Sequence, residues 1–287
     1  MCYVFNNEAG AFPPPRDAVS QHAKGRGAAA VDLFPRFDRQ EPAPNAPRKT
    51  GLPRLWELVR RDFWDCFRAG LLALAGCLPF LAGMFFSVST HTMLLAPLLG
   101  LAGGALAGPE LCALADTLLR GLRDNTGRVW WHTYRAAWRR SAKASLLPGA
   151  LGGGLLAAQL FLLLHAEALQ VDLTIGMALV LGLLLLAGLS LYLWPQLALM
   201  ELPLGRLLQN SVLLFLGRLP RTAAALAWLA LYALASLRFF SFALSLLPLT
   251  NLWLPLLPAL FLVYPGLEEA FQLKERFRDA PPGPGEP

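Results

Sequence analysis

Two charged residues, Glu110 and Arg238, interrupt long apolar stretches and are the side chains best placed for chemistry inside a membrane. An ionisable group within a membrane is costly, so it usually marks a path for a proton, an ion or a substrate. Each also has a simpler interpretation: Glu110 lies near the basic segment that follows it, and Arg238 lies far enough along its stretch to extend toward the opposite surface. Their expected depths differ by roughly 15 Å at 1.5 Å per residue, which disfavours a direct pair.

The histidines and cysteines form no pattern typical of an enzyme or a metal centre. The histidines are scattered, at His22, His91, His132 and His165. The cysteines share no CxxC spacing, and three of them fit small buried side chains: Cys66, Cys77 and Cys112. No Ser-His-Asp set, carboxylate pair, phosphate-binding loop or HExxH motif is present. We therefore expect no enzymatic activity, no metal site and no cofactor.

The composition identifies the class of protein that must position these residues. Of the 287 residues, 55% are hydrophobic and only 15% are charged, whereas soluble domains carry about 25% charged residues. Because a membrane-spanning helix needs roughly 20 apolar residues, the long uncharged stretches predict an all-α polytopic membrane protein with six spans. The expected spans cover about 69–90, 92–115, 144–164, 174–198, 222–246 and 250–266.

The remaining segments divide the chain into four parts. Residues 1–50 are rich in proline and poor in aliphatic side chains, so we expect a disordered tail. Residues 51–68 combine aromatic and basic side chains at helical spacing, which predicts an amphipathic lead-in helix at the membrane surface. The six-span membrane domain occupies 69–267, and a polar tail follows at 268–287.

The distribution of positive charge predicts the orientation. The segment from Asp116 to Lys143 holds seven Lys or Arg and two acidic residues, and Glu201 to Arg221 is a second basic connection. The connections near His91, 165–172 and Thr250 hold no Lys or Arg. Since Lys and Arg are retained on the cytoplasmic side, both termini are expected in the cytoplasm.

The segment from Arg128 to Ala144 predicts an interfacial helix with two different faces. At 100° per residue, the aromatic side chains fall on one side and the basic ones on the other. This pattern is typical of a helix at the lipid headgroups, and a docking surface for a cytoplasmic protein is the functional alternative. The residues concerned are Trp130, Tyr134, Arg135, Trp138, Arg139 and Lys143. Nucleic acid is not expected as a partner, because the aromatic residues face away from the basic stripe.

Small residues and prolines are placed where they affect helix packing. Gly100, Gly104 and Gly108 recur every four residues, which lets two helices approach closely. Packing within the bundle is the favoured interpretation, and homodimerisation through this face is the alternative. Four prolines near the end favour a broken last span, and broken helices in membranes usually line a cavity or are covered by protein. A kinked final span explains these prolines equally well. They are Pro248, Pro255, Pro258 and Pro265.

Several short segments resemble the YesL-type bacterial integral membrane proteins, a family of unknown function. They are LWELVRRDFWDCF with CLPF at Cys77, AGPELCALADTLLRGLRDNTGRVWW, WRRSAKASLL, and LYLWPQLALMELPLGRLLQNSVLLFLGRLPR. In their order they cover roughly residues 33–270. The chain departs from the family at Arg139-Arg140-Ser141, where the family often has Asn-Trp-Lys, and no functional residues can be transferred.

The resemblance implies a bacterial plasma-membrane protein associated with carbohydrate uptake, since family members tend to be encoded near sugar ABC-transport systems. We expect a non-enzymatic accessory or regulatory protein in the lipid bilayer, with components of a carbohydrate ABC transporter as partners. The alternative is a small-solute transporter that uses a polar path near Glu110 and Arg238 and the proline-broken last span.

Overall fold

The computed structural model describes residues 51–124, 130–200 and 202–272, and within these ranges the chain is helical and contains no strand. The predicted tail at 1–50, Arg128 of the predicted interfacial helix, and the polar tail from 273 onward lie outside the described residues. Eight helices are described: α1 Leu52–Ser89, α2 Leu95–Leu122, α3 Trp130–Leu164, α4 Leu173–Leu199, α5 Leu204–Gly217, α6 Leu219–Arg238, α7 Phe240–Thr250 and α8 Trp253–Phe271.

Six of these helices are long and apolar enough to cross a membrane: α1, α2, α3, α4, α6 and α8. The predicted fold class, an all-α polytopic membrane protein, is confirmed at this level. Large apolar side chains remain exposed along α4, among them Leu181, Leu184 and Leu185. In water such a surface would be unstable, whereas in a bilayer it faces hydrocarbon.

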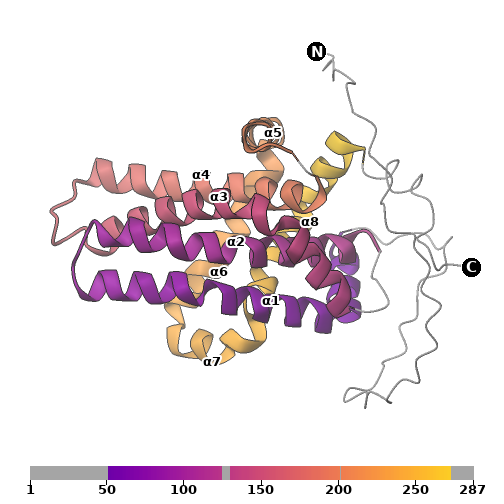
Figure 1. The fold of residues 1–287 in the computed structure, drawn as a ribbon, viewed down its shortest axis with the longest axis horizontal. Coiled ribbons are helices and arrows are strands. Elements are labelled where there is room, and N and C mark those ends of the chain that lie inside the picture. Colours follow the sequence, from indigo (N-terminus) through magenta and orange to yellow (C-terminus); the bar gives the residue numbers. More distant parts are fainter. Residues whose placement is uncertain (1–50, 125–129, 201, 273–287) are drawn as a thin grey trace, which may run out of the picture. The chain divides into compact units, whose positions relative to one another are not determined.

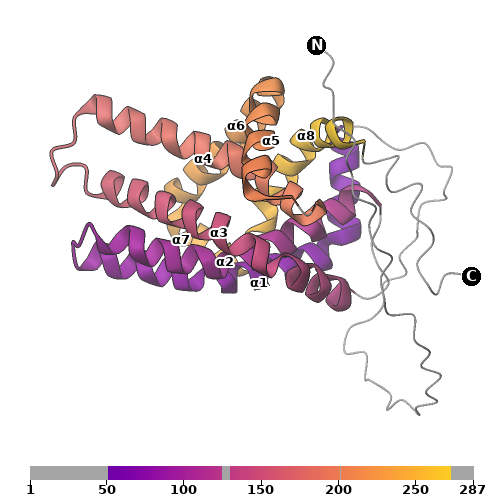
Figure 2. The same cartoon turned by 45° about the horizontal axis from the view of Figure 1, so that its top comes forward.

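Helices α1 to α4 run alternately in opposite directions (Figures 1 and 2). The α1–α2 turn and the α3–α4 loop lie together at one end, which we call the histidine end. The beginnings of α1 and α3 and the ends of α2 and α4 lie at the opposite end, which we call the charged end. The short helix α5 runs across the direction of these long helices near the charged end (Figure 2).

Two boundaries drawn from the sequence are absent from the structure. The lead-in helix at 51–68 and the span at 69–90 form the single helix α1, and the predicted interfacial helix continues into the next span as α3. No helix-breaking residue separates these parts, so the hydrogen-bond ladder continues through them. The 38 residues of α1 are about 57 Å long at 1.5 Å per residue. This length is nearly twice the roughly 30 Å of hydrocarbon, so part of α1 projects beyond the membrane.

The prediction of a proline-broken last span is wrong, because Pro258 and Pro265 lie inside the continuous helix α8. The chain breaks instead at Phe239, between α6 and α7, and at Asn251, between α7 and α8. Asn251 has a φ of +25°, and its side-chain oxygen accepts a hydrogen bond from the backbone N–H of Trp253 at 3.1 Å. The turn is thus fixed by an asparagine, which tolerates this backbone region better than most residues.

The predicted span at 222–246 is also wrong in its extent, because α6 ends at Arg238 and α7 is a separate helix. Pro248 lies inside α7 and does not end it. The last span is correspondingly displaced, since α8 begins at Trp253 rather than near 250.

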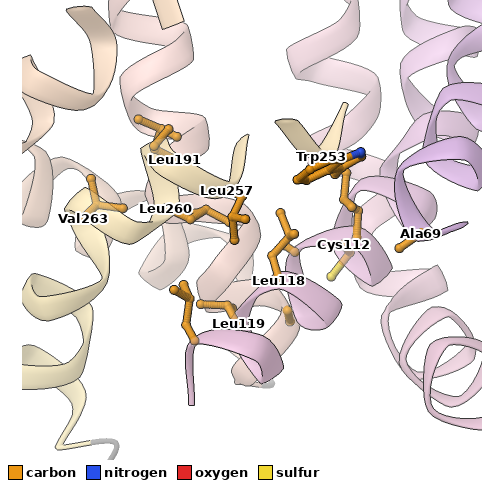
Figure 3. Close-up of a cluster of buried hydrophobic side chains, with 14 of the residues drawn as sticks. Ala69, Cys112, Leu118, Leu119, Leu191, Trp253, Leu257, Leu260 and Val263 are labelled. Atoms are coloured by element: carbon orange, nitrogen blue, oxygen red, sulfur yellow. The ribbon is translucent and has the colours of Figure 1, made fainter. Parts of the chain in front are cut away.

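A buried apolar cluster joins α8 to α1, α2 and α4 (Figure 3). Leucines of α2 and α8 form much of this cluster, and α8 contributes buried side chains on successive turns. The labelled members are Ala69, Cys112, Leu118, Leu119, Leu191, Trp253, Leu257, Leu260 and Val263. This contact holds the last span against the first two, so helices distant in sequence form one bundle.

Candidate functional site

The charged end contains a network of ion pairs that we call the arginine–aspartate cluster: Arg54, Arg61, Asp62, Asp116, Arg120, Asp124 and Arg140. Asp124 follows the end of α2 and accepts hydrogen bonds from two arginines of α1. Arg54 Nη2 lies 2.5 and 2.6 Å from its two carboxylate oxygens, and Arg61 Nη1 lies 2.5 Å from Oδ1. These charge-assisted bonds fix the end of α2 to the beginning of α1.

The protonation of Asp124 follows from these contacts. Burial by itself would raise the pKa of this carboxyl group, but hydrogen bonds and charge from Arg54 and Arg61 outweigh burial. The pKa of Asp124 is therefore held below its usual value of 3.8. At neutral pH the Asp124 carboxylate is therefore ionised, and it joins the end of α2 to α1 through Arg54 and Arg61.

A second part of the cluster links α2 to α3 and α4 through the buried Asp116. Arg120 Nε lies 2.6 Å from Asp116 Oδ2, and Arg140 Nη2 of α3 lies 3.5 Å from Oδ1. Arg140 Nη2 also donates to the carbonyl oxygen of Ala198 at 2.8 Å, in the last turn of α4. Carbonyls in the last turn of a helix lack partners within the helix, so Arg140 both caps α4 and joins it to α2 and α3.

Glu110, the first intramembrane charge predicted from the sequence, has a defined partner. The hydroxyl of Tyr134 on α3 donates a hydrogen bond to Glu110 Oε2 at 2.5 Å. The stem of Glu110 crosses Gly76 of α1, where a Cβ atom would collide with it. The carboxylate thus lies between α1, α2 and α3 and joins α2 to α3.

Arg238, the second predicted charge, lies elsewhere. It is the last residue of α6, it is exposed, and its guanidinium lies 5.9 Å from the ring centroid of Phe239. An arginine at a helix end beside an aromatic ring is typical of a membrane interface. The structure therefore places Glu110 and Arg238 in separate environments, as their expected depths indicated.

The first turns of α3 correct the prediction that the aromatic face meets the lipid headgroups. Tyr134 is only 4% exposed, and Trp130 is partly covered, with the Arg68 guanidinium 5.8 Å from its ring centroid. The angular pattern identified the common face, but this face packs mainly against α1 and α2. Trp138 is 36% exposed, so it is the one of the three predicted aromatic residues with an open surface.

The basic stripe of the same helix is exposed. Arg135, Arg139 and Lys143 all face outward. None of the ion pairs among the described residues includes them. Their charge is therefore presented outward on a helix whose opposite face is fixed, which suits recognition of an acidic surface.

A seam of glycines holds α2 against α3. A Cβ atom on Gly100 would lie 2.7 Å from the Gly153 carbonyl oxygen, and one on Gly108 would lie 2.5 Å from the Ser145 carbonyl oxygen. Gly104 meets the backbone of α3 in the same way. The glycine face is thus used inside the bundle, as the spacing favoured, and α3 occupies the surface that a homodimer would have needed.

An apolar groove lies between α1, α2, α3 and α4. Its volume is about 240 Å³, and glycine, alanine and leucine form most of its lining. Cys77, Ser190 and Trp194 are the lining residues with polar side-chain atoms. Such a surface suits a hydrocarbon chain better than a sugar, which needs several hydrogen-bond partners.

A much smaller polar cavity of about 20 Å³ lies within the charged end, between Asp62, Asp65, Arg120, Trp130 and neighbouring side chains. Its volume suits a single water molecule. The indole Nε1 of Trp130 is buried and has no hydrogen-bond partner among the described residues. The space is too small for a metabolite.

Several polar contacts within the apolar helices escaped the sequence analysis. Tyr192 of α4 and Thr222 of α6 share a hydrogen bond of 2.6 Å, and Gln196 Nε2 donates to Ser211 of α5 at 3.1 Å. Tyr192, Gln196, Ser211 and Thr222 are all buried. A glutamine inside an apolar stretch was the available signal, because a membrane helix rarely leaves an amide without a partner.

The described residues contain no group of three or more His, Cys, Asp or Glu side chains that could hold a metal ion. Of the three cysteines predicted to be buried, Cys66 and Cys112 are buried and Cys77 is half-buried. All three are free thiols. Comparison with protein-family models finds no match, and no curated protein and no solved structure matches the chain.

Proposed function

We propose that this protein is a non-enzymatic accessory or regulatory protein of a bacterial plasma membrane, with both termini in the cytoplasm. Its partner is a component of a carbohydrate ABC transporter, bound at the charged end. The observation that carries the proposal is the exposed stripe of Arg135, Arg139 and Lys143 on α3. The opposite face of this helix is buried against the bundle. The link to carbohydrate uptake comes from the resemblance to YesL-type proteins alone.

The fixed helix supports a binding role, because a rigid surface loses little entropy when a partner binds. Tyr134 and Arg140 tie α3 to α2 and α4, and Arg68 lies against Trp130. The acidic groups of the arginine–aspartate cluster already have arginine partners, whereas the three cations of the stripe form no ion pair with any residue that the structure describes. By the positive-inside rule this end faces the cytoplasm, which is where the ATPase subunits of an ABC transporter lie.

The test is recovery of the transporter from mild detergent with tagged protein. We expect a subunit of a carbohydrate ABC transporter to copurify, and we expect the triple change of Arg135, Arg139 and Lys143 to Gln to reduce its yield at least tenfold. A matched control removes the same charge from three other exposed arginines, Arg60, Arg206 and Arg221. Recovery of no transporter subunit, or equal loss in both triple variants, would count against the proposal.

Small-solute transport is the alternative, and fewer observations favour it. Glu110 is hydrogen-bonded to Tyr134, Arg238 is exposed at a helix end, and the groove between α1 and α4 is apolar. Solute flux into proteoliposomes tests this alternative. Sugar or ion flux that Glu110→Gln abolishes would favour transport over an accessory role.

A further inference from the structure

We propose that His91 and His165 form a binding site for a divalent transition-metal ion at the histidine end. The two residues are 74 positions apart in sequence, and the fold brings them together. His91 lies in the α1–α2 turn, and His165 directly follows α3. Their side chains meet with His91 Nδ1 and His165 Nε2 3.1 Å apart. Imidazole nitrogen is a preferred ligand of copper, nickel and zinc.

The separation of the two nitrogens suits two ligands of one ion. Bonds of about 2.0–2.1 Å between a metal and imidazole nitrogens place two neighbouring ligand atoms roughly 2.9–3.4 Å apart, for bond angles between square-planar and tetrahedral values. The observed 3.1 Å lies inside this range. The two nitrogens therefore already lie at the separation that a shared ion requires.

His165 is held in the form that a metal ligand requires. Its Nδ1 lies 3.0 Å from the carbonyl oxygen of Phe161, and because a carbonyl only accepts, Nδ1 carries the hydrogen. Nε2 then presents its lone pair toward His91 and accepts a hydrogen bond from His91 Nδ1. A bound ion replaces this hydrogen bond when His91 takes its other neutral tautomer, with the hydrogen on Nε2. The imidazole also stacks on the buried Phe161 ring, with centroids 4.2 Å apart. A ligand histidine whose second nitrogen donates to a backbone carbonyl is the usual arrangement in metal sites.

His91 occupies a left-handed backbone conformation that is uncommon for residues other than glycine. Its φ is +53°, in the left-handed region where glycine or asparagine is favoured. Strain of this kind is concentrated at functional sites, and here it directs the imidazole toward α3.

The surroundings suit a cation. The segments 85–97 and 160–175 contain no Lys or Arg, and both carboxylates of this end, Glu167 and Asp172, are exposed on the α3–α4 loop. His91 is exposed as well, so water can supply the ligands that complete the coordination. By the general order of affinities, copper(II) binds most tightly at such a site, followed by nickel(II) and zinc(II).

The test is titration of the full chain in detergent with copper(II) and with nickel(II), followed by calorimetry and, for copper, electron paramagnetic resonance. The protein carries a tag without histidine and the change Cys2→Ser, so that no N-terminal thiol competes for copper. We expect one ion per chain, with nitrogen ligands in the copper spectrum. His91→Asn, which suits the left-handed backbone, and His165→Gln should each weaken binding at least tenfold.

Control variants separate this site from other histidines. His132→Ala removes an exposed histidine at the charged end, and His22→Ala removes the remaining one; both should bind as the parent does. Unfolding of every variant is measured without metal, so that loss of binding is compared only among folded proteins. The proposal is overturned if the parent shows no saturable binding of one ion, or if folded His91→Asn and His165→Gln variants bind like the parent.

Discussion

The glycine seam between α2 and α3 predicts that a single added methyl group destabilises the bundle. A Cβ atom on Gly104 would lie 2.7 Å from the Cα atom of Gly153, and closer still to the carbonyl oxygen of Gly149. Ordinary van der Waals contact begins at 3.4 Å, so the added Cβ atom would lie at least about 0.7 Å too close to α3. The atoms that it meets belong to the backbone rather than to a flexible side chain. Gly104→Ala can therefore be accommodated only if the two helices move apart.

The expected magnitude follows from the contacts that such a movement weakens. A gap of 0.5–1 Å removes roughly a quarter to a half of each dispersion contact, and the neighbouring Gly100 and Gly108 share the same seam. Overpacking of this kind typically costs about 1–3 kcal/mol. We expect a loss of this size in the free energy of unfolding, measured by titration with sodium dodecyl sulfate in mixed micelles and followed by tryptophan fluorescence.

Gly152→Ala provides the matched control, on the partner helix α3. A Cβ atom there meets nothing within 4 Å, and alanine is the better helix former. This variant should unfold at the same denaturant concentration as the parent, or at a slightly higher one. If Gly104→Ala proves as stable as Gly152→Ala, the helices are not in backbone contact and the reasoning is refuted.

Three further predictions concern polar contacts, each measured by unfolding in the same micelles. Tyr134→Phe should cost about 1–3 kcal/mol, because it leaves the Glu110 carboxylate without its donor; an unchanged unfolding midpoint would show that water replaces the hydroxyl. Since folding lowers the pKa of Asp124, the contribution of this carboxylate to stability is complete above the unfolded pKa near 3.8 and is lost as pH falls through the folded pKa. Asp124→Asn should therefore lower stability at pH 7 and reduce the loss of stability below pH 4, and a parallel pH profile would contradict this. Asn251→Ala removes the acceptor of the Trp253 N–H and should cost about 1 kcal/mol; equal stability would mean that the turn does not depend on this side chain.

The number of spans was predictable because it depends on hydropathy and length, which are local properties. Each of the six predicted spans corresponds to one helix that is long and apolar enough to cross a membrane. The boundaries were less predictable. Arg238 and Phe239 carry no helix-breaking signature, yet the chain breaks there, while Pro258 and Pro265 remain inside α8. A membrane helix tolerates proline where neighbouring helices stabilise the backbone.

The candidate site divides in a similar way. The angular pattern of α3 correctly separates the exposed Arg135 and Arg139 from the face that holds Tyr134, because the helical period is a local property. It does not say whether lipid or protein covers that face. The partners of Glu110 and His165 depend on which helices become neighbours, and the spacing of residues along one chain does not contain this information.

The glycine seam also determines how the bundle responds to its membrane. Contacts between backbones do not depend on side-chain rotamers. We therefore expect α2 and α3 to keep a constant distance and to move as one rigid unit. Helix α4 presents mostly apolar side chains outward over its first half and is joined to its neighbours near the charged end, by buried apolar side chains such as Leu191 and Leu197 and by a few polar contacts. When the hydrocarbon thickness changes, a spanning helix adapts by tilting. We expect α4 to make this adjustment, while α2 and α3 keep their mutual geometry and preserve the surface at the charged end.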